Sequence, residues 1–538
     1  MTTRLAGNAT HFLPFNLGHN GGAGNPPDPR GRTYRTAYLW EEVLHRDSLL
    51  DLLARFLHLQ NDERISDSGK RVKKETMIFP RYHQLQAMRQ LVSASAEEGP
   101  GHNYLIEHSA GSGKSNTIAW LAHRLSSLHD VNDKRVFDSV IVVTDRLVLD
   151  KQLQDTIKQF EQVQGVVLPI TQNSAQLKEA LEKGKDIIIT TLQKFSVIAE
   201  SMQALQGHHF AVIIDEAHSS QGGKASGALN EALSDPEDTV NEELERRMKA
   251  RKMLTNASYF AFTATPKNKT LEIFGRPDPQ PDGTVRHLPF HSYTMKQAIQ
   301  EGFILDVLKY YTPIYSYYKL AKTVESDPEF DTKRARKKLR RYVEGHEHAI
   351  RLKAEIMVDH FHDQVLAFNK IGGQARAMVI TNGIVLAIKY FHAISDYLKE
   401  RKSHYQAIVA FSGEHEYGGS KVSEASLNGF PSSQIAAKIQ EDPYRFLICA
   451  DKFQTGYDEP LLHTMYVDKM LSGIKAVQAL SRLNRAHPKK HDVFVLDFLN
   501  DADTIRESFA DFYRTTLLAD ETNPDKVHDL QRDLDGYQ

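Results

Sequence analysis

The chain has 538 residues, and its 67 Lys and Arg residues nearly balance 69 Asp and Glu residues, for a net charge of -2. This length predicts several units, each with its own core, and the charge excludes a globally basic nucleic-acid-binding protein. The single cysteine, Cys449, excludes a disulfide framework and a cysteine-based metal site. Because neither a signal sequence nor an apolar run of membrane-spanning length is present, we expect a cytoplasmic, soluble protein.

The N-terminal region predicts an arm, a helical stretch and a linker. Glycines and prolines interrupt residues 1–35, which we expect to be loop. Apolar residues at helical spacing over 39–59 predict helix, with a break near Asp47-Ser48. Residues 62–74 are charged and poor in apolar side chains. We interpret them as a linker.

Gln84 lies in the sequence Arg81-Tyr82-His83-Gln84 and is a candidate base reader. A glutamine amide can pair with both N6 and N7 of adenine, and a neighbouring aromatic ring can stack on the base. The start of an ordinary helix with polar surface residues explains the sequence equally well. Both interpretations stay open at this point.

The stretch from His108 to Ser115, His-Ser-Ala-Gly-Ser-Gly-Lys-Ser, predicts a phosphate-binding loop between a strand and a helix. Glycines let the backbone N–H groups approach a polyphosphate at a helix N-terminus. The lysine supplies a cation for the β- and γ-phosphates, and the following serine a hydroxyl for Mg²⁺. The pattern departs from G-x-x-x-x-G-K-[ST] only at His108. The expected phosphate-binding residues are Gly111, Ser112, Gly113, Lys114 and Ser115.

A second acidic motif follows about a hundred residues later. The apolar run Phe210–Ile214 predicts a buried strand, and Asp215-Glu216 follows it directly. Asp215 is placed to hold Mg²⁺, and Glu216 to orient or deprotonate an attacking water. An exposed acidic turn would not explain why both motifs occur in this order. Together they predict a nucleotide hydrolase that uses ATP and Mg²⁺.

Strands and helices alternate through most of the chain, which predicts an α/β fold with parallel sheets. Ligands bind such sheets at the carboxyl ends of the strands, where Thr144, Thr190 and Thr263 are expected beside the two motifs. A second alternating block without its own phosphate loop begins near residue 300. The predicted strands are 139–144, 187–190, 210–214 and 259–263, then 377–381, 407–411, 446–450, 465–467 and 493–496.

Gln478, Arg482 and Arg485 would share one face of a helix in the second block. Two guanidinium groups facing a γ-phosphate would be arginine fingers, although surface helix residues remain the alternative. The basic run 333–341 could contact DNA phosphates, but such a run more often is a solvated helix face. The charged stretch 235–252 is interpreted as a solvated helix.

These motifs together resemble those of a superfamily 2 DNA helicase. Their particular residues resemble the motor of the type I restriction endonuclease R subunit. Beyond the two motifs above, the resemblance rests on Val143-Thr-Asp-Arg146, Phe262-Thr-Ala-Thr-Pro266, Lys452-Phe-Gln-Thr-Gly-Tyr-Asp458 and Gln478–Arg485. It implies two tandem RecA-like domains and an ATP-driven translocase of double-stranded DNA, with methyltransferase (M) and specificity (S) subunits as partners. It further implies that Thr263 and Thr265 couple hydrolysis to DNA grip, and that Thr144, Arg146 and Thr455 contact the DNA backbone.

The expected domains are an N-terminal arm and helical linker (1–75), an ATP-binding RecA-like domain (76–295), a second RecA-like domain (296–500) and the start of a C-terminal region (501–538). R subunits normally add an N-terminal nuclease and a C-terminal helical region, for which this chain is too short, so we expect no nuclease site in it. A stand-alone superfamily 2 helicase or remodeller and an ATP-regulated DNA clamp are the alternative functions.

Overall fold

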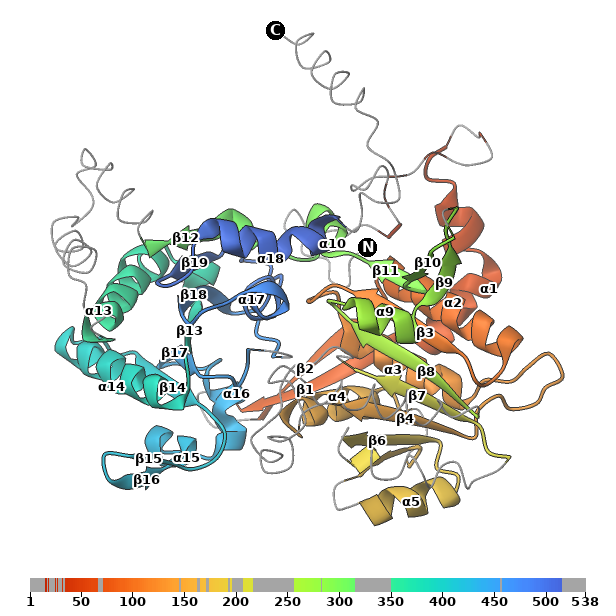
Figure 1. Ribbon diagram of the computed structural model, residues 1–538, viewed down its shortest axis with the longest axis horizontal. Helices are drawn as coiled ribbons and strands as arrows, with labels where there is room; N and C mark the ends of the chain where they lie inside the picture. Colours follow the sequence, from red (N-terminus) through yellow and green to blue (C-terminus); the bar gives the residue numbers. More distant parts are fainter. Residues whose placement is uncertain are drawn as a thin grey trace, which may run out of the picture. The chain divides into compact units, whose positions relative to one another are not determined.

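The computed structural model divides the chain into two compact units, Met1–Glu301 and Gly302–Gln538 (Figure 1). The described part comprises residues 15–16, 18, 25, 27, 31, 34–65, 71–144, 147–161, 165–170, 174–191, 194–195, 207–215, 256–281, 283–314, 350–454 and 457–514. The stretches 235–252 and 333–341 lie outside it, so their interpretation stays a prediction.

Unit 1 is built on a seven-stranded sheet in the order β11-β3-β8-β7-β4-β6-β5. Every neighbouring pair is parallel, so all carboxyl ends of the strands lie along one edge. The predicted parallel sheet is therefore confirmed, although sequence reasoning missed β5 and β11, which have only three residues each. The strands are β3 Asn103–His108, β4 Ser139–Thr144, β5 Val167–Pro169, β6 Ile187–Thr191, β7 Phe210–Ile214, β8 Ala257–Thr263 and β11 His291–Tyr293.

Alternate side chains of this sheet enter two separate cores, one on each face. Tyr104 and Ile106 of β3 pack with α2, α3 and α4, whereas Leu105 packs with α5 and α9. This pattern follows from the two-residue period of a strand and explains the continuous apolar runs of the sequence. The helices are α2 Tyr82–Glu98, α3 Lys114–Ser126, α4 Leu147–Gln159, α5 Ser174–Glu182, α9 Asn268–Phe274 and α10 Met295–Gln300, and a small hairpin joins β9 Arg276–Pro279 to β10 Val285–Leu288.

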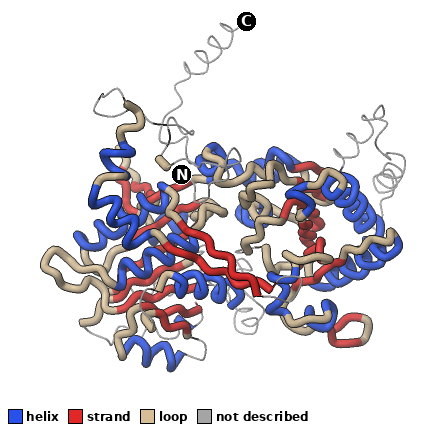
Figure 2. The backbone as a smooth tube through the Cα atoms, turned by 180° about the vertical axis from the view of Figure 1, so that it is seen from behind, coloured by secondary structure: helices blue, strands red, loops and turns tan. Residues whose placement is uncertain are grey.

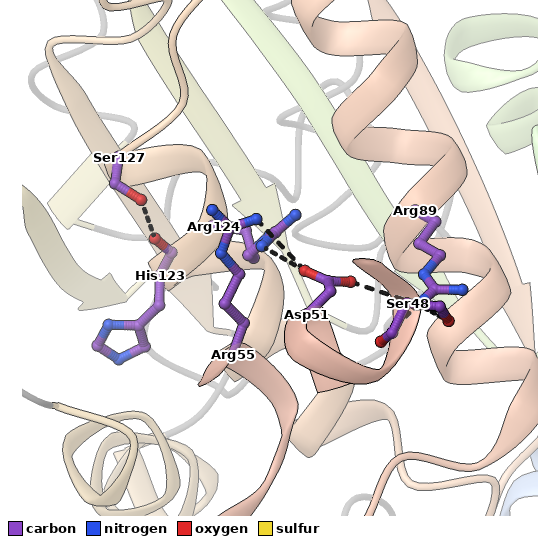
Figure 3. A network of polar contacts seen from close by, with 7 residues as sticks. All are labelled: Ser48, Asp51, Arg55, Arg89, His123, Arg124 and Ser127. Atoms are coloured by element: carbon purple, nitrogen blue, oxygen red, sulfur yellow. Dashed lines mark hydrogen bonds and ion pairs between the residues drawn. The ribbon is translucent and has the colours of Figure 1, made fainter. Parts of the chain in front are cut away.

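The N-terminal helical stretch consists of a π-helical turn, Leu39–Val43, then α1, Arg46–Asp51, and a second π-helical segment, Leu52–Phe56. The predicted helix is thus present, but its break lies at Leu44-His45 and not at Asp47-Ser48. Asp51 fixes it to the core, because its carboxylate pairs with Arg89 of α2 at 3.5 Å and with Arg124 of α3 at 3.1 Å (Figure 3). The stretch is therefore tied to the two helices that flank the phosphate loop.

The predicted linker 62–74 is wrong, because much of it belongs to an antiparallel hairpin of β1, His58–Ile65, and β2, Arg71–Ile78. The paired strands are visible near the middle of Figure 2. In their register Asp62 and Glu63 lie opposite Lys74 and Lys73. Backbone hydrogen bonds between two antiparallel strands do not need an apolar core, so a charged sequence can still form a hairpin.

Unit 2 contains a six-stranded sheet in the order β12-β19-β18-β13-β17-β14, again entirely parallel. The second predicted α/β domain is confirmed, with β12 as the missed edge strand. The strands are β12 Tyr311–Pro313, β13 Arg376–Thr381, β14 Gln406–Ala410, β17 Tyr444–Cys449, β18 Leu462–Asp468 and β19 Phe494–Asp497. A small hairpin pairs β15 His415–Tyr417 with β16 Ser420–Val422, and the α-helices are α13 Ile350–His360, α14 Ile384–Glu400, α15 Glu424–Asn428, α16 Ile435–Lys438, α17 Gly473–Leu480 and α18 Ala502–Arg514.

A buried polar network ties two helices of unit 2 to the end of β18. The Asp468 carboxylate accepts hydrogen bonds from Lys353 of α13 and from Tyr390 of α14, each at 2.6 Å. The Lys353 and Asp468 side chains are only 3% and 6% exposed. The cost of burying each charge is compensated only while both partners are present.

Across the described ranges, no helix is both long and apolar enough to cross a lipid bilayer.

Candidate nucleotide-binding site

The phosphate loop follows β3 and leads directly into α3. Gly111 and Gly113 have φ angles of 90° and 88°, a region that side chains disfavour. A Cβ on Gly113 would lie 2.8 Å from Gln84 Nε2. The loop therefore needs glycine at position 113 both for its backbone angle and for its contact with α2.

Three consecutive loop carbonyls are held by side chains from the beginning of α2. Arg81 Nη1 donates to Gly111 O at 3.3 Å, and Gln84 Nε2 donates to Gly113 O at 2.9 Å. Between them, His83 Nε2 lies 3.2 Å from Ser112 O. The C=O and the following N–H of a trans peptide point in opposite directions. The N–H groups of Gly113 and Lys114 therefore face away from α2, as anion binding at the α3 N-terminus requires.

Lys114 and Ser115 begin α3, so their side chains start beside these N–H groups. The ammonium group of Lys114 lies 3.4 Å from His108 O, at the end of β3. Its position next to the loop fits a cation for a bound polyphosphate. The structure thus brings together the five residues that the sequence motif predicted for phosphate binding.

Buried histidines form a layer behind the loop. His108 Nε2 lies 2.9 Å from His291 Nδ1 of β11, and the His83 ring stacks on Tyr293 with ring centroids 3.7 Å apart. Burial lowers the pKa of His291 to about 4, and it also lowers the pKa values of His83 and His108 well below the usual range. The rings are therefore neutral at physiological pH and act as hydrogen-bonding and packing groups.

Asp215 directly follows β7, and its N–H donates to Val143 O of β4 at 3.1 Å. Thr263 ends β8, the strand between β7 and the loop-bearing β3. Its Oγ1 accepts a hydrogen bond from Thr265 N at 3.1 Å, so the two threonines form one turn. The predicted residues Glu216, Arg146 and Thr455 lie outside the described part of the chain.

Buried hydroxyl groups gather at the same edge of the sheet. Thr144 and Thr190 lie at the ends of β4 and β6, and Ser112 and Thr265 lie in the loops after β3 and β8. Within the described ranges, the hydroxyls of these four residues have no hydrogen-bond partner. Unsatisfied buried polar groups are costly and call for a functional explanation, and a polar ligand at this edge would provide one. Thr144 is only 2% exposed, and its role in DNA contact stays a prediction.

The Gln84 side chain is engaged in holding the loop. Its Oε1 accepts from Arg81 N at 2.8 Å, and its Nε2 donates to Gly113 O and to Thr117 Oγ1 at 2.9 and 3.2 Å. A helix does begin here, since α2 starts at Tyr82, but the expected surface position is wrong, because His83 and Gln84 are only 1% and 3% exposed. Adenine reading by Gln84 stays a prediction, because these contacts already use both amide hydrogens.

The predicted helix over Gln478–Arg485 is wrong beyond Leu480, where α17 ends. The Arg482 side chain donates to Gln478 O at 3.1 Å and to Tyr457 O at 3.0 Å. It thereby takes the carbonyl that a continuing helix would offer to the backbone N–H of residue 482. Arg485 instead pairs with Asp458 at 2.9 Å, and the Asp458 side chain is about half exposed. The two arginines thus do not share a helix face, and Arg482 supports the turn.

Sequence reasoning missed the role of the residues that hold the loop from behind. Arg81 and His83 were visible only as neighbours of Gln84, and His291 and Tyr293 come from a strand about 180 residues after the loop. No local pattern marks such residues, since a three-residue edge strand has no periodicity. Only the fold brings them to the site.

Comparison with known proteins shows which families this chain resembles. The family model "SWI2/SNF2 ATPase" matches residues 83–341, and the model "Type I restriction enzyme subunit R domain 3" matches residues 422–499. The HindI endonuclease subunit of Haemophilus influenzae is 23% identical over 88% of this chain and 44% of its own length. A Staphylococcus aureus subunit, SauMRSORF196P, is 23% identical over 91% of this chain and 53% of its own. This chain therefore spans about half the length of these curated relatives.

Among solved structures, the ATP-dependent type ISP restriction-modification enzyme LlaBIII bound to DNA matches 85% of this chain and 31% of its own, with a TM-score of 0.50 and 14% identity. At this identity the match supports the fold alone. Two tandem parallel sheets, a glycine-rich loop between β3 and α3 and the two family models agree with one another. Residues 83–341 are thus similar to the SWI2/SNF2 ATPase family, and the chain as a whole is similar to the endonuclease subunits of type I restriction enzymes.

Proposed function

We propose that this chain is the motor part of a type I restriction R subunit, which couples ATP hydrolysis to movement along double-stranded DNA. The observation that carries the proposal is the loop with its three carbonyls held by Arg81, His83 and Gln84. This arrangement orients two loop N–H groups toward an anion before any ligand binds. Such preorganisation costs no rearrangement when the nucleotide arrives.

In this proposal the loop N–H groups and Lys114 bind the phosphates, while Asp215 and Glu216 serve the hydrolytic step. Ser115 and Asp215 would hold Mg²⁺, since a hydroxyl and a carboxylate are the hard oxygen ligands that this ion prefers. The ion would supply positive charge to the transferring phosphate. Glu216 would orient or deprotonate the attacking water, and Arg485 would stabilise the charge of the transition state.

Thr263 and Thr265 are proposed to couple ATP hydrolysis to the strength of DNA binding. Their turn directly follows β8, next to the strand that carries Asp215, so a change at Asp215 has a short path to them. Thr144, Arg146 and Thr455 are proposed backbone contacts on DNA. Double-stranded DNA and the M and S subunits are the proposed partners, by analogy with the relatives' place in restriction systems.

Steady-state ATP hydrolysis tests the proposal, measured without DNA, with linear duplex DNA and with single-stranded DNA. We expect duplex DNA to stimulate hydrolysis most strongly. Lys114→Ala should abolish turnover, whereas Lys134→Ala, a change at an exposed lysine, should not affect it. Normal turnover of Lys114→Ala would refute the site.

The DNA samples of this assay, together with a strand-separation assay on a forked duplex, separate the motor from its alternatives. Nucleotide binding with slow turnover that no DNA stimulates would favour the clamp. Separation of the strands of a forked duplex would favour a helicase, since a pure duplex translocase does not unwind.

A further inference from the structure

Glu301, the last residue of unit 1, makes a buried carboxylate clamp. Its Oε1 accepts from Tyr82 Oη and its Oε2 from Tyr293 Oη, each at 2.6 Å, and the residue is 5% exposed. Gln297 Nε2 donates to Tyr82 Oη at 2.7 Å and orients that phenol. Short O–H···O bonds to a carboxylate are among the strong hydrogen bonds of proteins. We call these four residues the Glu301 clamp.

The clamp grips the part of α2 that holds the phosphate loop. Tyr82 is the first residue of α2, between Arg81 and His83, and Gln84 follows. These three neighbours bind the carbonyls of Gly111, Ser112 and Gly113. Tyr293 adds a second link, because its ring stacks on His83 and its carbonyl accepts from Ser109 N at 2.9 Å. A displacement of Glu301 therefore acts on both supports of the loop.

The chain immediately after Glu301 is anchored to the turn Arg482–Arg485 of unit 2, which we call the arginine turn. Leu305 N donates to Asn484 O at 2.9 Å, and Ile304 forms an antiparallel bridge with Arg485. Phe303 and Ile304 are buried, at 1% and 2% exposure. Gly302, between the two anchors, has a φ of 72°. The connecting segment Gly302–Leu305 is thus fastened at both ends.

Chain length sets an upper limit on the span of this connection. Four residues beyond Glu301 reach at most about 14 Å even when fully extended. A shift at the arginine turn that exceeds the slack in Gly302–Leu305 would therefore either pull on the clamp or break one anchor. Because packed elements switch between discrete arrangements, such a tether can transmit a change from one site to the other.

We propose that Glu301 is a positioning residue that couples the phosphate loop to the Arg482–Arg485 turn through the segment Gly302–Leu305. This inference rests on the proposed function, because it takes nucleotide binding at the loop as one of the two coupled events. Nucleotide at the loop restrains the clamp and hence the segment. Loss of the clamp leaves the loop able to bind nucleotide but uncouples the segment from it.

Hydrogen exchange on the full chain tests the coupling, with and without a saturating nonhydrolysable ATP analogue and Mg²⁺. In the unmodified protein, the analogue should slow exchange at 109–114, 302–305 and 482–485. Glu301→Gln replaces the carboxylate with an amide, whose single oxygen can accept from only one of the two phenols. In this variant the loop should still be protected from exchange by the analogue. The slowing at 302–305 and 482–485 should fall by about tenfold, within the usual range of coupling between sites. Glu179→Gln removes an exposed carboxylate on α5 and is the matched control.

Each result decides between the proposals. Equal slowing at 302–305 in the control and in Glu301→Gln overturns the coupling. Binding of the analogue to the unmodified protein without any slowing at 302–305 overturns the coupling alone, whereas no binding at all overturns both proposals. If Glu301→Gln does not fold, Tyr82→Phe removes one clamp hydrogen bond while keeping the ring, and the same comparison then decides.

Discussion

Gln84 illustrates how one side chain determines the shape of the phosphate loop. Its amide joins the first turn of α2 to Gly113 and to Thr117 of α3, and it is buried. Gly113 O also accepts from the backbone N–H groups of Asn116 and Thr117, so loss of Gln84 removes one of several hydrogen bonds, at a cost of about 0.5–1.5 kcal/mol. The two possible roles of Gln84 differ in their effect on nucleotide preference. A residue that only supports the loop serves every nucleoside triphosphate alike, whereas a residue that reads the base favours adenine.

We therefore expect Gln84→Ala to raise the KM for ATP and for GTP by a similar factor of about tenfold, as one lost hydrogen bond to a polar group would do. The measurement is kcat/KM for both nucleotides. Gln90→Ala, at an exposed position of the same helix, is the control. A selective loss of ATP over GTP would instead establish Gln84 as the adenine reader.

Arg482 and Arg485 are expected to fail in different ways. Arg482 is buried and donates to two backbone carbonyls, so Arg482→Ala should destabilise the protein by about 3 kcal/mol. Arg485 pairs with a half-exposed carboxylate, so Arg485→Ala should change stability by less than about 1 kcal/mol. As the proposed finger, it should lower ATP hydrolysis by roughly 10³-fold with nucleotide binding retained. Urea unfolding and ATPase assays check both variants, and unchanged hydrolysis in Arg485→Ala would remove its finger role.

At the scale of elements, the network of Lys353, Asp468 and Tyr390 joins α13 and α14 to β18. Lys353→Met would leave the buried Asp468 carboxylate without its cation and should destabilise unit 2 by about 3–5 kcal/mol. Replacing both partners, as in Lys353→Met with Asp468→Leu, should recover most of this loss. A double variant no more stable than the single one would show that the pair itself stabilises the fold.

The tryptophans give this experiment a way to tell the units apart. Both, Trp40 and Trp120, belong to unit 1. Fluorescence therefore follows unit 1, whereas far-UV circular dichroism follows both units. Lys353→Met should lower the midpoint of the dichroism transition and leave the fluorescence midpoint in place, because each unit has its own core.

The elements also show what the sequence could predict. Long apolar strands such as β4 and β7 were predictable, because a strand covered on both faces needs a continuous apolar run. The loop at Gly111 to Ser115 was predictable from its glycines, which adopt positive φ angles before α3 begins, and its role in phosphate binding stays a prediction. The hairpin β1–β2 was not, because its pairing depends on a partner strand and not on a core. Glu301 was not either, since its two phenol partners lie 219 and 8 residues away in sequence.

For the whole molecule, buried histidines predict acid sensitivity. Burial lowers the pKa of His360 to about 3 and the pKa values of His291, His362 and His463 to about 4. The unfolded chain binds protons at these groups near pH 6.5, before the folded protein does. Their contribution to stability is therefore complete above pH 6.5 and is lost as the pH falls from 6.5 toward 4.

Urea unfolding between pH 7 and pH 5 measures this effect, and the midpoint should fall with pH. In His291→Asn the fall should be less steep, because asparagine keeps a polar group near His108 but does not titrate. An equally steep fall in this variant would mean that His291 does not contribute to the pH dependence.

The strand order of unit 1 also has a consequence for synthesis on the ribosome. Strand β3 carries the phosphate loop, yet its two partners in the sheet are β8 and β11, which end at residues 263 and 293. One edge of β3 therefore stays unpaired until about 155 further residues have been translated, and the other until about 185 have been. Such distant pairing folds slowly and exposes strand edges to aggregation. The nascent chain should thus bind chaperones until β11 leaves the exit tunnel, and the nucleotide site is among the last parts of unit 1 to form.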